Sequence, residues 1–539
     1  MMAQFALDIL KLLGHLMNGV IFLLTLRARV RDGLSRKVWS KAERIDSGSY
    51  NQSHSVHLAF DGHGNALAVS NEYHNVYARY FTPDTGWGKP ELIDHTRDSD
   101  NPDKEARGGM NNPEAYFDLQ GNGLAAWDMG SGYDNENGYM HEAWSNRYSP
   151  TTGWGKAERF AHTPGESRAA KMACDMQGNT LAIWTHFADN SSTLWSSRYT
   201  DKSGWSKPAP IAQCRGNATL MELSFDPHGN ALVLWRTDKE GKNTRGRFSV
   251  YAIYYSAVTG WDKANILSKV LDSYHMGTLQ FAFDHGGNVI IVCSFMDSTD
   301  NEELVHIWAK RYDTNNGWEK AIKIDPGIVS DYSKLDSESV QPRIAFDCRG
   351  HAIVVWVQKS GSLQGTIWAN RHIPGKGWGK ASSISQGDCD DSSHQLAADH
   401  RGNAIVIWKQ GSGLTTSYYT ADVGWSTPEN IYPISGQTYQ TLGPKIVFNT
   451  DGIVVAIWWH QEFLYTTIWS RQYTPGKGWG KLTPVARDYT NKANYPYFKI
   501  DARNIAHVIW SQRDLDSSDT HYWTSHILKT QKISASKRK

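Results

Sequence analysis

Residues 225–235 read Phe-Asp-Pro-His-Gly-Asn-Ala-Leu-Val-Leu-Trp, and this stretch contains the unit that decides the fold. Asp226 can bond back to its own chain and Gly229 accepts a positive φ, which are the two requirements of a tight turn. The residues before Asp226 and the apolar run after Asn230 have the composition of short strands. The stretch therefore predicts a β-hairpin.

The hairpin motif recurs along the chain. The turn position is occupied by Asp61, Asp118, Asp175, Asp226, Asp284, Asp347, Asp399, and by Asn449 and Asp501 in two degenerate copies. A second motif, G-W-G-K or a variant, places tryptophans at Trp39, Trp87, Trp154, Trp205, Trp261, Trp318, Trp378, Trp425 and Trp479. Both motifs occur nine times, and the turn positions lie on average 55 residues apart. This period fits the blade of a β-propeller.

Each repeat reads as four short strands joined by hairpins. We therefore predict an all-β fold: a single β-propeller of nine four-stranded blades over residues 36–528. Eight blades, or two smaller propellers, are the alternatives, but no Pro/Gly/Ser linker interrupts the period. The chain begins with a lone fourth strand at Trp39 and ends with a repeat that has only three strands, so we expect the first strand to complete the last blade. Such closure removes an open sheet edge.

The 23 tryptophans follow the repeat. Besides the G-W set, seven lie nine residues after the turn residue and six start the third strand, so 22 of the 23 are in register. A large side chain at a fixed position of every repeat is expected to fill the space between blades. Trp459 alone is out of register and is a candidate ligand contact.

Metal binding and several enzyme classes find no support in the sequence. One carboxylate per turn gives too few ligands for calcium, and the acidic segment 128–142 lacks the EF-hand spacing. The five cysteines form no CxxC pair, and no nucleophile elbow, P-loop, Rossmann fingerprint or HExxH motif occurs. A net charge of +1 gives no field for nucleic acid. We expect no metal, no cofactor and no nucleic-acid partner.

A set of polar residues marks the innermost strand of every repeat. They stand four positions before the turn residue, and we call these nine the axial residues: His57, Glu114, Lys171, Glu222, Gln280, Arg343, Gln395, Lys445 and Tyr497. The next residue is apolar in all nine repeats, so the alternation puts the axial residues on one face of their strands. We expect them to surround the mouth of a central channel, where they either keep the channel hydrated or bind a polar ligand.

The two ends of the chain match no repeat. In residues 1–35, Phe5 to Leu26 has helical spacing of its polar residues and predicts an amphipathic helix that contacts a membrane peripherally or packs on the propeller. Arg27, Arg29 and Arg31 follow the apolar core, so a cleavable signal peptide is not expected. Residues 529–539 are basic and are predicted to be a disordered tail.

The composite motif F-D-x-x-G-N-A-x-A-x-W followed by W-x-x-R-Y-x-P-x-T-G-W-G-K-A resembles the tandem Trp-rich propeller repeats of bacterial, often secreted, proteins. More broadly it is similar to lectin-like, NHL-like and sialidase-like propellers. The sialidase Asp-box S-x-D-x-G-x-T-W is absent, so no catalytic residue is carried over. The resemblance implies the propeller fold and an extracellular or cell-envelope location.

Two functions from different classes remain open at this stage. The first is a non-enzymatic propeller that recognises a glycan or a protein through its variable loops and channel mouth. The alternative is a glycoside hydrolase or lyase in which Glu114 and Glu222 share acid and base roles, which for a hydrolase requires the two carboxyls to lie about 5–10 Å apart.

Overall fold

The computed structural model describes most of the repeat region. The described residues are 39–46, 53–72, 75–94, 110–134, 138–161, 166–188, 191–238, 248–267, 276–299, 302–326, 328–329, 341–359, 365–385, 389, 393–433, 439–462, 465–486, 493–501, 503–513 and 520–527. Lys41–Ile527 is one compact unit, and Met1–Ser40 with Leu528–Lys539 is a second. The helix predicted for residues 5–26, the rest of segment 1–35 and the tail 529–539 lie outside the described residues. Among the described residues, no helix is long and apolar enough to cross a bilayer.

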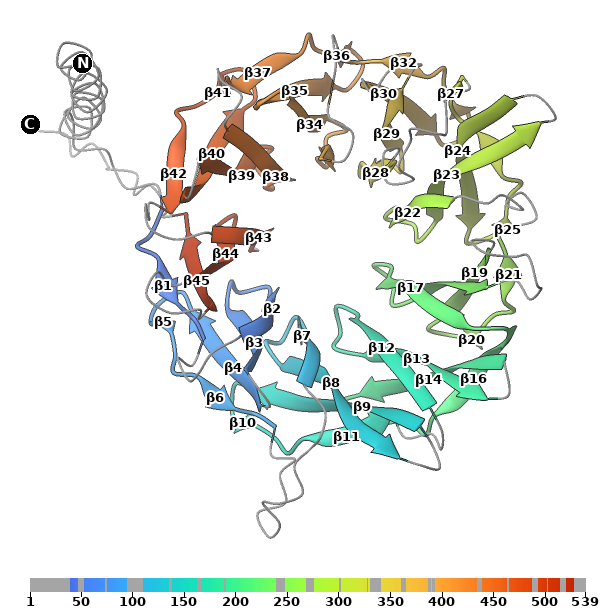
Figure 1. Ribbon diagram of the computed structural model, residues 1–539, viewed down its shortest axis with the longest axis vertical. Coiled ribbons are helices and arrows are strands. Elements are labelled where there is room, and N and C mark those ends of the chain that lie inside the picture. The colour runs from blue at the N-terminus through green and yellow to red at the C-terminus, as the bar shows by residue number, and fades with distance from the viewer. Residues whose placement is uncertain are drawn as a thin grey trace, which may run out of the picture. The chain divides into compact units, whose positions relative to one another are not determined.

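The unit Lys41–Ile527 is a nine-bladed β-propeller, in which nine antiparallel sheets surround one axis (Figure 1). The inner strands are β2 (Ser53–Phe60), β7 (Met110–Phe117), β12 (Glu166–Cys174), β17 (Ala218–Phe225), β22 (Met276–Phe283), β28 (Arg343–Phe346), β33 (Gln395–Ala398), β38 (Tyr439–Phe448) and β43 (Ala493–Ile500). The second strands are β3 (Ala66–Glu72), β8 (Gly123–Asp134), β13 (Thr180–Ala188), β18 (Ala231–Asp238), β23 (Val289–Thr299), β29 (Ala352–Lys359), β34 (Ala404–Gln410), β39 (Val454–Glu462) and β44 (Ala506–Arg513). The third strands are β4 (Asn75–Thr82), β9 (Gly138–Ser149), β14 (Ser191–Thr200), β19 (Phe248–Ser256), β24 (Glu302–Asp313), β30 (Gly365–Ile373), β35 (Gly413–Thr420), β40 (Tyr465–Thr474) and β45 (Thr520–His526). We number the blades 1 to 9 in the order of these inner strands.

The outer strand of blades 1 to 8 differs from the expected single segment. In these eight blades it is split into two short strands that both pair with the third strand. The first parts are β5 (Gly86–Trp87), β10 (Gly153–Trp154), β15 (Gly204–Trp205), β20 (Gly260–Trp261), β25 (Gly317–Trp318), β31 (Gly377–Trp378), β36 (Gly424–Trp425) and β41 (Gly478–Trp479). The second parts are β6 (Glu91–Leu92), β11 (Glu158–Ala161), β16 (Ala209–Arg215), β21 (Asn265–Ile266), β26 (Ile322–Lys323), β32 (Ser382–Ser383), β37 (Glu429–Tyr432) and β42 (Thr483–Ala486), and blade 5 adds β27 (Ile328–Val329).

The ring closes as the permuted ends predict. Strand β1 (Glu43–Arg44) pairs antiparallel with β45, so Glu43 lies opposite Thr524 and Arg44 lies opposite Trp523. The amide of Ile45 extends this pairing through a 2.9 Å hydrogen bond to the carbonyl of Tyr522. Blade 9 therefore takes its outer strand from the start of the repeat region.

The repeated turns use their aspartates as predicted. In blade 4, Asp226 Oδ1 accepts hydrogen bonds from the backbone amides of His228 and Asn230, both at 2.8 Å, and Asp226 Oδ2 accepts one from the Asn230 side chain at 2.8 Å. The same amide bonds recur at all nine turns, with Asn449 replacing Asp in blade 8. These turn carboxylates are part of the scaffold.

The turn glycines allow adjacent blades to approach closely. Gly178 in blade 3 has a φ of +84°, and a Cβ built on it would lie 2.9 Å from both Cβ and Oδ2 of Asp118 in blade 2. Both the backbone conformation and the neighbouring turn therefore require glycine at this position. The nine hairpins are thus coupled to one another as well as being local turns.

Tryptophans build the interior, as their register predicts. The set nine residues after the turn, for example Trp356 in β29, is at most 2% exposed. In blades 1 to 8 the Trp of the G-W motif is partly buried and rests on the ring opposite it in the third strand, as Trp318 does on Tyr312 with ring centroids 5.1 Å apart. Both sets have structural roles.

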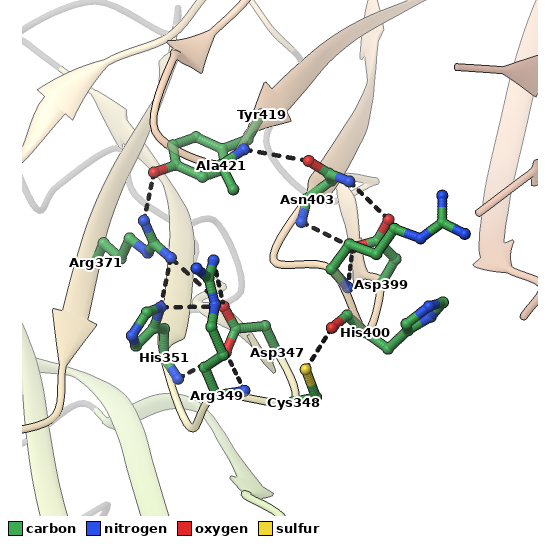
Figure 2. Close-up of polar contacts among 11 residues, drawn as sticks. Asp347, Cys348, Arg349, His351, Arg371, Asp399, His400, Asn403, Tyr419 and Ala421 are labelled. Atoms are coloured by element: carbon green, nitrogen blue, oxygen red, sulfur yellow. Dashed lines mark hydrogen bonds and ion pairs between the residues drawn. The ribbon is translucent and has the colours of Figure 1, made fainter. Parts of the chain in front are cut away.

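Polar contacts between turns also link blades 6 and 7 (Figure 2). Arg371 on β30 contacts His351 at 2.7 Å and the hydroxyl of Tyr419 in blade 7 at 2.6 Å, and its guanidinium lies 5.2 Å from the Tyr419 ring centroid. The thiol of Cys348 donates a hydrogen bond to the carbonyl of His400 in blade 7. The side chains that link the turns of blades 6 and 7 therefore already have hydrogen-bonding or ring-stacking partners within the protein.

Candidate functional site

The axial residues stand where regular strand pairing begins in most inner strands. In blades 2, 3, 4, 8 and 9 the pairing register shifts just before the axial residue and resumes at it, as between Asn111 and Glu114 in β7. In blades 6 and 7 the inner strand starts at Arg343 and Gln395 themselves. Such a register shift is the mark of a β-bulge, which bends a strand and redirects its side chains. In the blades with a register shift, the inner strand is therefore bent just before the axial residue, and this bend affects the direction of its side chain.

The structure places the axial residues at the contacts between neighbouring inner strands. None of the nine is fully buried, and Glu222 and Lys445 are exposed. His57 reaches the neighbouring blade, because its Nδ1 accepts a 3.0 Å hydrogen bond from the amide of Ala115 in blade 2. All nine axial residues lie on the innermost strands, whose inner surface we call the axial wall.

Glu114 and Tyr116 form a polar pair on β7. The Tyr116 hydroxyl lies 2.5 Å from Glu114 Oε2 and 2.7 Å from the carbonyl oxygen of Met172 in blade 3. A phenol has one proton, so it can satisfy only one of these two acceptors as a donor. The Glu114 carboxyl and the Met172 carbonyl therefore share this one donor, and a hydrogen bond from the phenol stabilises the ionised form of Glu114.

Burial of Glu114 acts in the opposite direction and is the largest influence, so the pKa of this carboxyl is raised to about 7. The negative charges of Asp128 and Glu222 also raise this pKa, whereas the Tyr116 hydrogen bond and the Lys171 ammonium lower it. Lys171 and Glu222 come from blades 3 and 4, so three successive axial residues interact electrostatically. This carboxyl changes charge near neutral pH, as acid–base groups in active sites commonly do.

His57 lies on the other side of this pair. Burial, followed by the charge of Lys499, lowers its pKa to about 4, so the imidazole is neutral at pH 7. Because Nδ1 accepts a hydrogen bond, the proton of the neutral ring is on Nε2. The ring centroid lies 6.2 Å from that of Tyr116 and 5.8 Å from that of Tyr497. We call His57, Glu114, Tyr116, Tyr497 and Lys499 the blade 9–1–2 cluster.

Two members of this cluster were missed by the sequence reasoning. Tyr116 and Lys499 stand two residues before the turn residue, and each contacts a backbone carbonyl in the following blade, those of Met172 and Leu58. The other seven repeats have small residues at this position: Ala59, Ala173, Ser224, Ala282, Ala345, Ala397 and Val447. A comparison of this column across the repeats carries the signal that would have found them.

The remaining candidates lie on the far side of the ring. Arg343 on β28 and Lys445 on β38 are separated by one blade, whose axial residue is Gln395, and Gln280 precedes Arg343 in blade 5. Trp459 on β39 lies over the bulge before Lys445, since a Cβ added to Gly443 would lie 1.7 Å from its ring. The structure therefore brings Trp459 close to the axial wall of blade 8.

A hollow of about 440 Å³ occupies the turn end of blades 3 to 6. Phe225, Phe283 and Phe346 line it together with turn aspartates such as Asp226. Those carboxylates are already bonded within their turns, so the hollow offers a ligand mostly apolar surface. No group of three or more His, Cys, Asp or Glu in the described ranges is arranged to hold a metal ion.

The comparisons with known proteins assign no family to the chain. No family model matches it, and no curated protein matches its sequence. Among solved structures, polysaccharide lyase Uly1 is similar to it with a TM-score of 0.38 and 11% identity, over 70% of this chain and 94% of the lyase. The intramolecular trans-sialidase from Ruminococcus gnavus has a TM-score of 0.28 and 11% identity, over 66% of this chain and 90% of the enzyme. The NanB sialidase from Streptococcus pneumoniae has a TM-score of 0.31 and 11% identity, over 86% of this chain and 83% of the sialidase. These distant likenesses transfer neither an activity nor a residue to this chain.

Proposed function

We propose that the axial wall binds a polar ligand of the glycan class. The observation that carries the proposal is that nine equivalent positions, most of them at bulges, hold nine assorted polar or phenolic side chains on an otherwise repetitive scaffold. If the wall only had to stay hydrated, any polar residue would serve at these positions. A ligand of defined shape requires particular residues at particular positions.

The chemistry of the wall suits a sugar. Sugar hydroxyls both donate and accept hydrogen bonds, and the axial residues supply carboxyl, amide, phenol and ammonium groups on one surface. Tyr497 and Trp459 add aromatic rings beside these groups, which suits the apolar faces of a pyranose. A protein partner bound through the variable loops was the other expectation, but parts of those loops lie outside the described residues, so we base the proposal on the wall.

A second function, acid–base cleavage of a glycan, is favoured by the burial of the Glu114 carboxyl beside Tyr116. A carboxyl whose pKa is about 7 exists in both protonation states at neutral pH and can donate or accept a proton at a reacting bond. In a hydrolase the second carboxyl group would come from Glu222, which acts on Glu114 across blade 3. In this reading the blade 9–1–2 cluster is the centre of the reaction.

A glycan array with a parallel cleavage assay tests both functions. The full chain, its Glu114→Gln variant and the control Glu158→Gln, an exposed residue of β11, are compared on the same glycans. We expect binding by the full chain and by the control, and at least about tenfold weaker binding by Glu114→Gln, the loss for one hydrogen bond to a charged or strongly polar group. Failure of the full chain to bind any glycan would overturn the proposal. Release of new reducing ends or unsaturated sugars that stops only in Glu114→Gln would establish the second function.

A further inference from the structure

The charges of the axial residues are unevenly distributed around the ring. In blades 2 to 4, Glu114, Lys171 and Glu222 alternate in sign, so the one cation lies between two acids. In blades 5 to 8 the order is Gln280, Arg343, Gln395 and Lys445, with two cations and no acid. One side of the wall therefore holds charges of both signs next to each other, and the other carries an excess of two positive charges.

Contacts in the described ranges do not neutralise these two cations. Arg343 Nη2 donates a 3.1 Å hydrogen bond to the neutral amide oxygen of Gln341, and its buried Nε has no hydrogen-bond partner among the described residues. Neither Arg343 nor Lys445 forms an ion pair with another of the described residues. A guanidinium that is partly removed from water without a counterion is costly, and a bound anion would offset that cost.

The two cations also act on each other. Although Lys445 is exposed, partial desolvation lowers the pKa of its ammonium, and the positive charge of Arg343 lowers it as well. Burial lowers the pKa of Arg343 as well. Because like charges repel, each cation disfavours the charged form of the other, and a bound anion would relieve this repulsion.

His394, which adjoins Arg343, does not change this balance. It is fully buried, and burial together with the Arg343 charge lowers its pKa to about 3. The imidazole is therefore neutral at pH 7, and it neither adds to nor compensates the two positive charges. The groups that a ligand meets on this side are the guanidinium, the ammonium and the flanking amides of Gln280 and Gln395.

We infer that Arg343 and Lys445 form an oxyanion subsite, which binds a sulfate, carboxylate or phosphate group between blades 6 and 8. The guanidinium can present two parallel donors to two oxygens of one anion, and the ammonium supplies a mobile point charge from the other side. If the ligand is a glycan, this inference rests on the proposed function and specifies that the glycan is acidic. The binding of an oxyanion by Arg343 and Lys445 does not itself depend on the proposed function.

The subsite is tested first with inorganic anions on the full chain. Sodium sulfate and sodium phosphate are compared with sodium chloride at equal ionic strength, and binding is followed by calorimetry and by the melting temperature. We expect sulfate or phosphate, but not chloride, to raise the melting temperature, and binding to weaken by at least about tenfold in Arg343→Gln and in Lys445→Gln. The controls are Arg236→Gln, an exposed arginine of β18, and Lys380→Gln, an exposed lysine before β32, and both should bind the anion as the full chain does.

A second readout separates anion binding from damage to the fold. In chloride buffer, Arg343→Gln should melt no lower than the full chain, because it removes an uncompensated charge. Anion-induced stabilisation that is equal in the full chain, Arg343→Gln and Lys445→Gln would overturn the inference. So would the absence of any response of the full chain to sulfate and phosphate.

Polymeric ligands then distinguish the sources of the anion and separate this inference from the proposed function. Dextran sulfate, polygalacturonate and neutral dextran present a sulfate ester, a carboxylate and no charge on comparable chains. Binding of a charged polymer that is lost in Arg343→Gln supports the subsite and names its anion. Binding of neutral glycans alone would support the proposed function and overturn the oxyanion subsite. Binding of inorganic anions without any glycan would support the subsite and overturn the proposed function.

Discussion

Tyr116 in blade 2 and Lys499 in blade 9 occupy the same position of their inner strands, and each donates a hydrogen bond to the carbonyl three residues before the turn of the following blade. Between them lies His57, which contacts the Tyr116 and Tyr497 rings and receives the amide of Ala115. The other seven blades have small residues at this position. The two larger side chains, Tyr116 and Lys499, thus enclose the neutral imidazole of His57 and the Glu114 carboxyl, whose pKa is raised. The blade 9–1–2 cluster depends on these two side chains.

Replacing Tyr116 by Phe should raise the pKa of Glu114 above about 7, because the Tyr116 hydrogen bond lowers that pKa in the intact chain. Titration of the Glu114 side-chain carboxyl by carbon-detected NMR measures the change. Tyr148→Phe, a substitution on β9 outside the cluster, should leave the titration unchanged. A Glu114 pKa that falls in Tyr116→Phe would contradict the described hydrogen bond.

The raised pKa of Glu114 predicts a stability that falls as pH rises. Between about pH 4.5, the ordinary value, and about pH 7, the folded chain holds a proton on Glu114 that the unfolded chain has lost, so unfolding becomes easier through this window. Glu114→Gln removes this effect and should gain about 1–3 kcal/mol relative to the intact chain between pH 5 and pH 8. His57, with a lowered pKa, acts in the opposite direction below about pH 6.5, but it is common to both proteins and cancels in the difference.

The difference in melting temperature between Glu114→Gln and the intact chain, followed across pH, measures this effect. Glu158→Gln, on the exposed side of β11, should show no trend with pH. A constant difference for Glu114→Gln would show that the carboxyl has an ordinary pKa in the folded protein.

The close approach of adjacent turns predicts an unequal response of two glycines in blades 2 and 3. Gly178→Ala puts a Cβ 2.9 Å from Asp118 in addition to straining a φ of +84°, whereas Gly153→Ala has a φ of +75° and nothing within 4 Å. We expect Gly153→Ala to lose about 1–2 kcal/mol of unfolding free energy through backbone strain alone. Gly178→Ala should lose about 1–3 kcal/mol more through the overpacked contact. Equal denaturation midpoints would show that the turns do not constrain each other.

Trp356 should be a stability residue and not a ligand contact. It is 0% exposed at the centre of a core cluster between blades 5 and 6, so Trp356→Ala should lose about 3–5 kcal/mol of unfolding free energy. Trp318→Ala, on the partly buried outer strand of blade 5, should lose less. Chemical denaturation followed by circular dichroism gives both values, and glycan or anion binding at low temperature should survive in both variants. Loss of binding in a fully stable Trp356→Ala would reverse this interpretation.

The sequence was sufficient for the repetitive part of the fold because the physics there is local. Asp226 and Gly229 specify a turn by their own hydrogen bonds and φ, and Trp356 is buried because its register repeats. The order of the strands near Trp39 and Trp523 was enough to predict that the first strand completes the last blade. The pairing of Arg44 with Trp523 confirms this ring closure. The split outer strand was not predicted, because both halves of G-W-G-K-A-x-x-I look like one strand when read alone.

The candidate site could be predicted only in part. The axial residues were visible as a column of the repeat, but the bulge before Lys171 depends on how β12 pairs with β13, which no single strand specifies. The neutral state of His57 was beyond reach as well, since it follows from burial against blade 2 and from Lys499, which is distant in sequence. Contacts between residues far apart in the chain decide the chemistry, while local residues decide the scaffold.

The pairing of Arg44 with Trp523 has a consequence for the order in which the molecule can be made. These two residues lie at opposite ends of the repeat region, so during synthesis β1 leaves the ribosome long before β45 exists. Eight blades can acquire their strands one after another as the chain emerges, but the ninth must wait, and the ring stays open until then. Closing it joins segments separated by nearly the whole chain, an entropically expensive step that comes last. The nascent protein thus passes through a stage with two unpaired sheet edges, when protection from aggregation matters most.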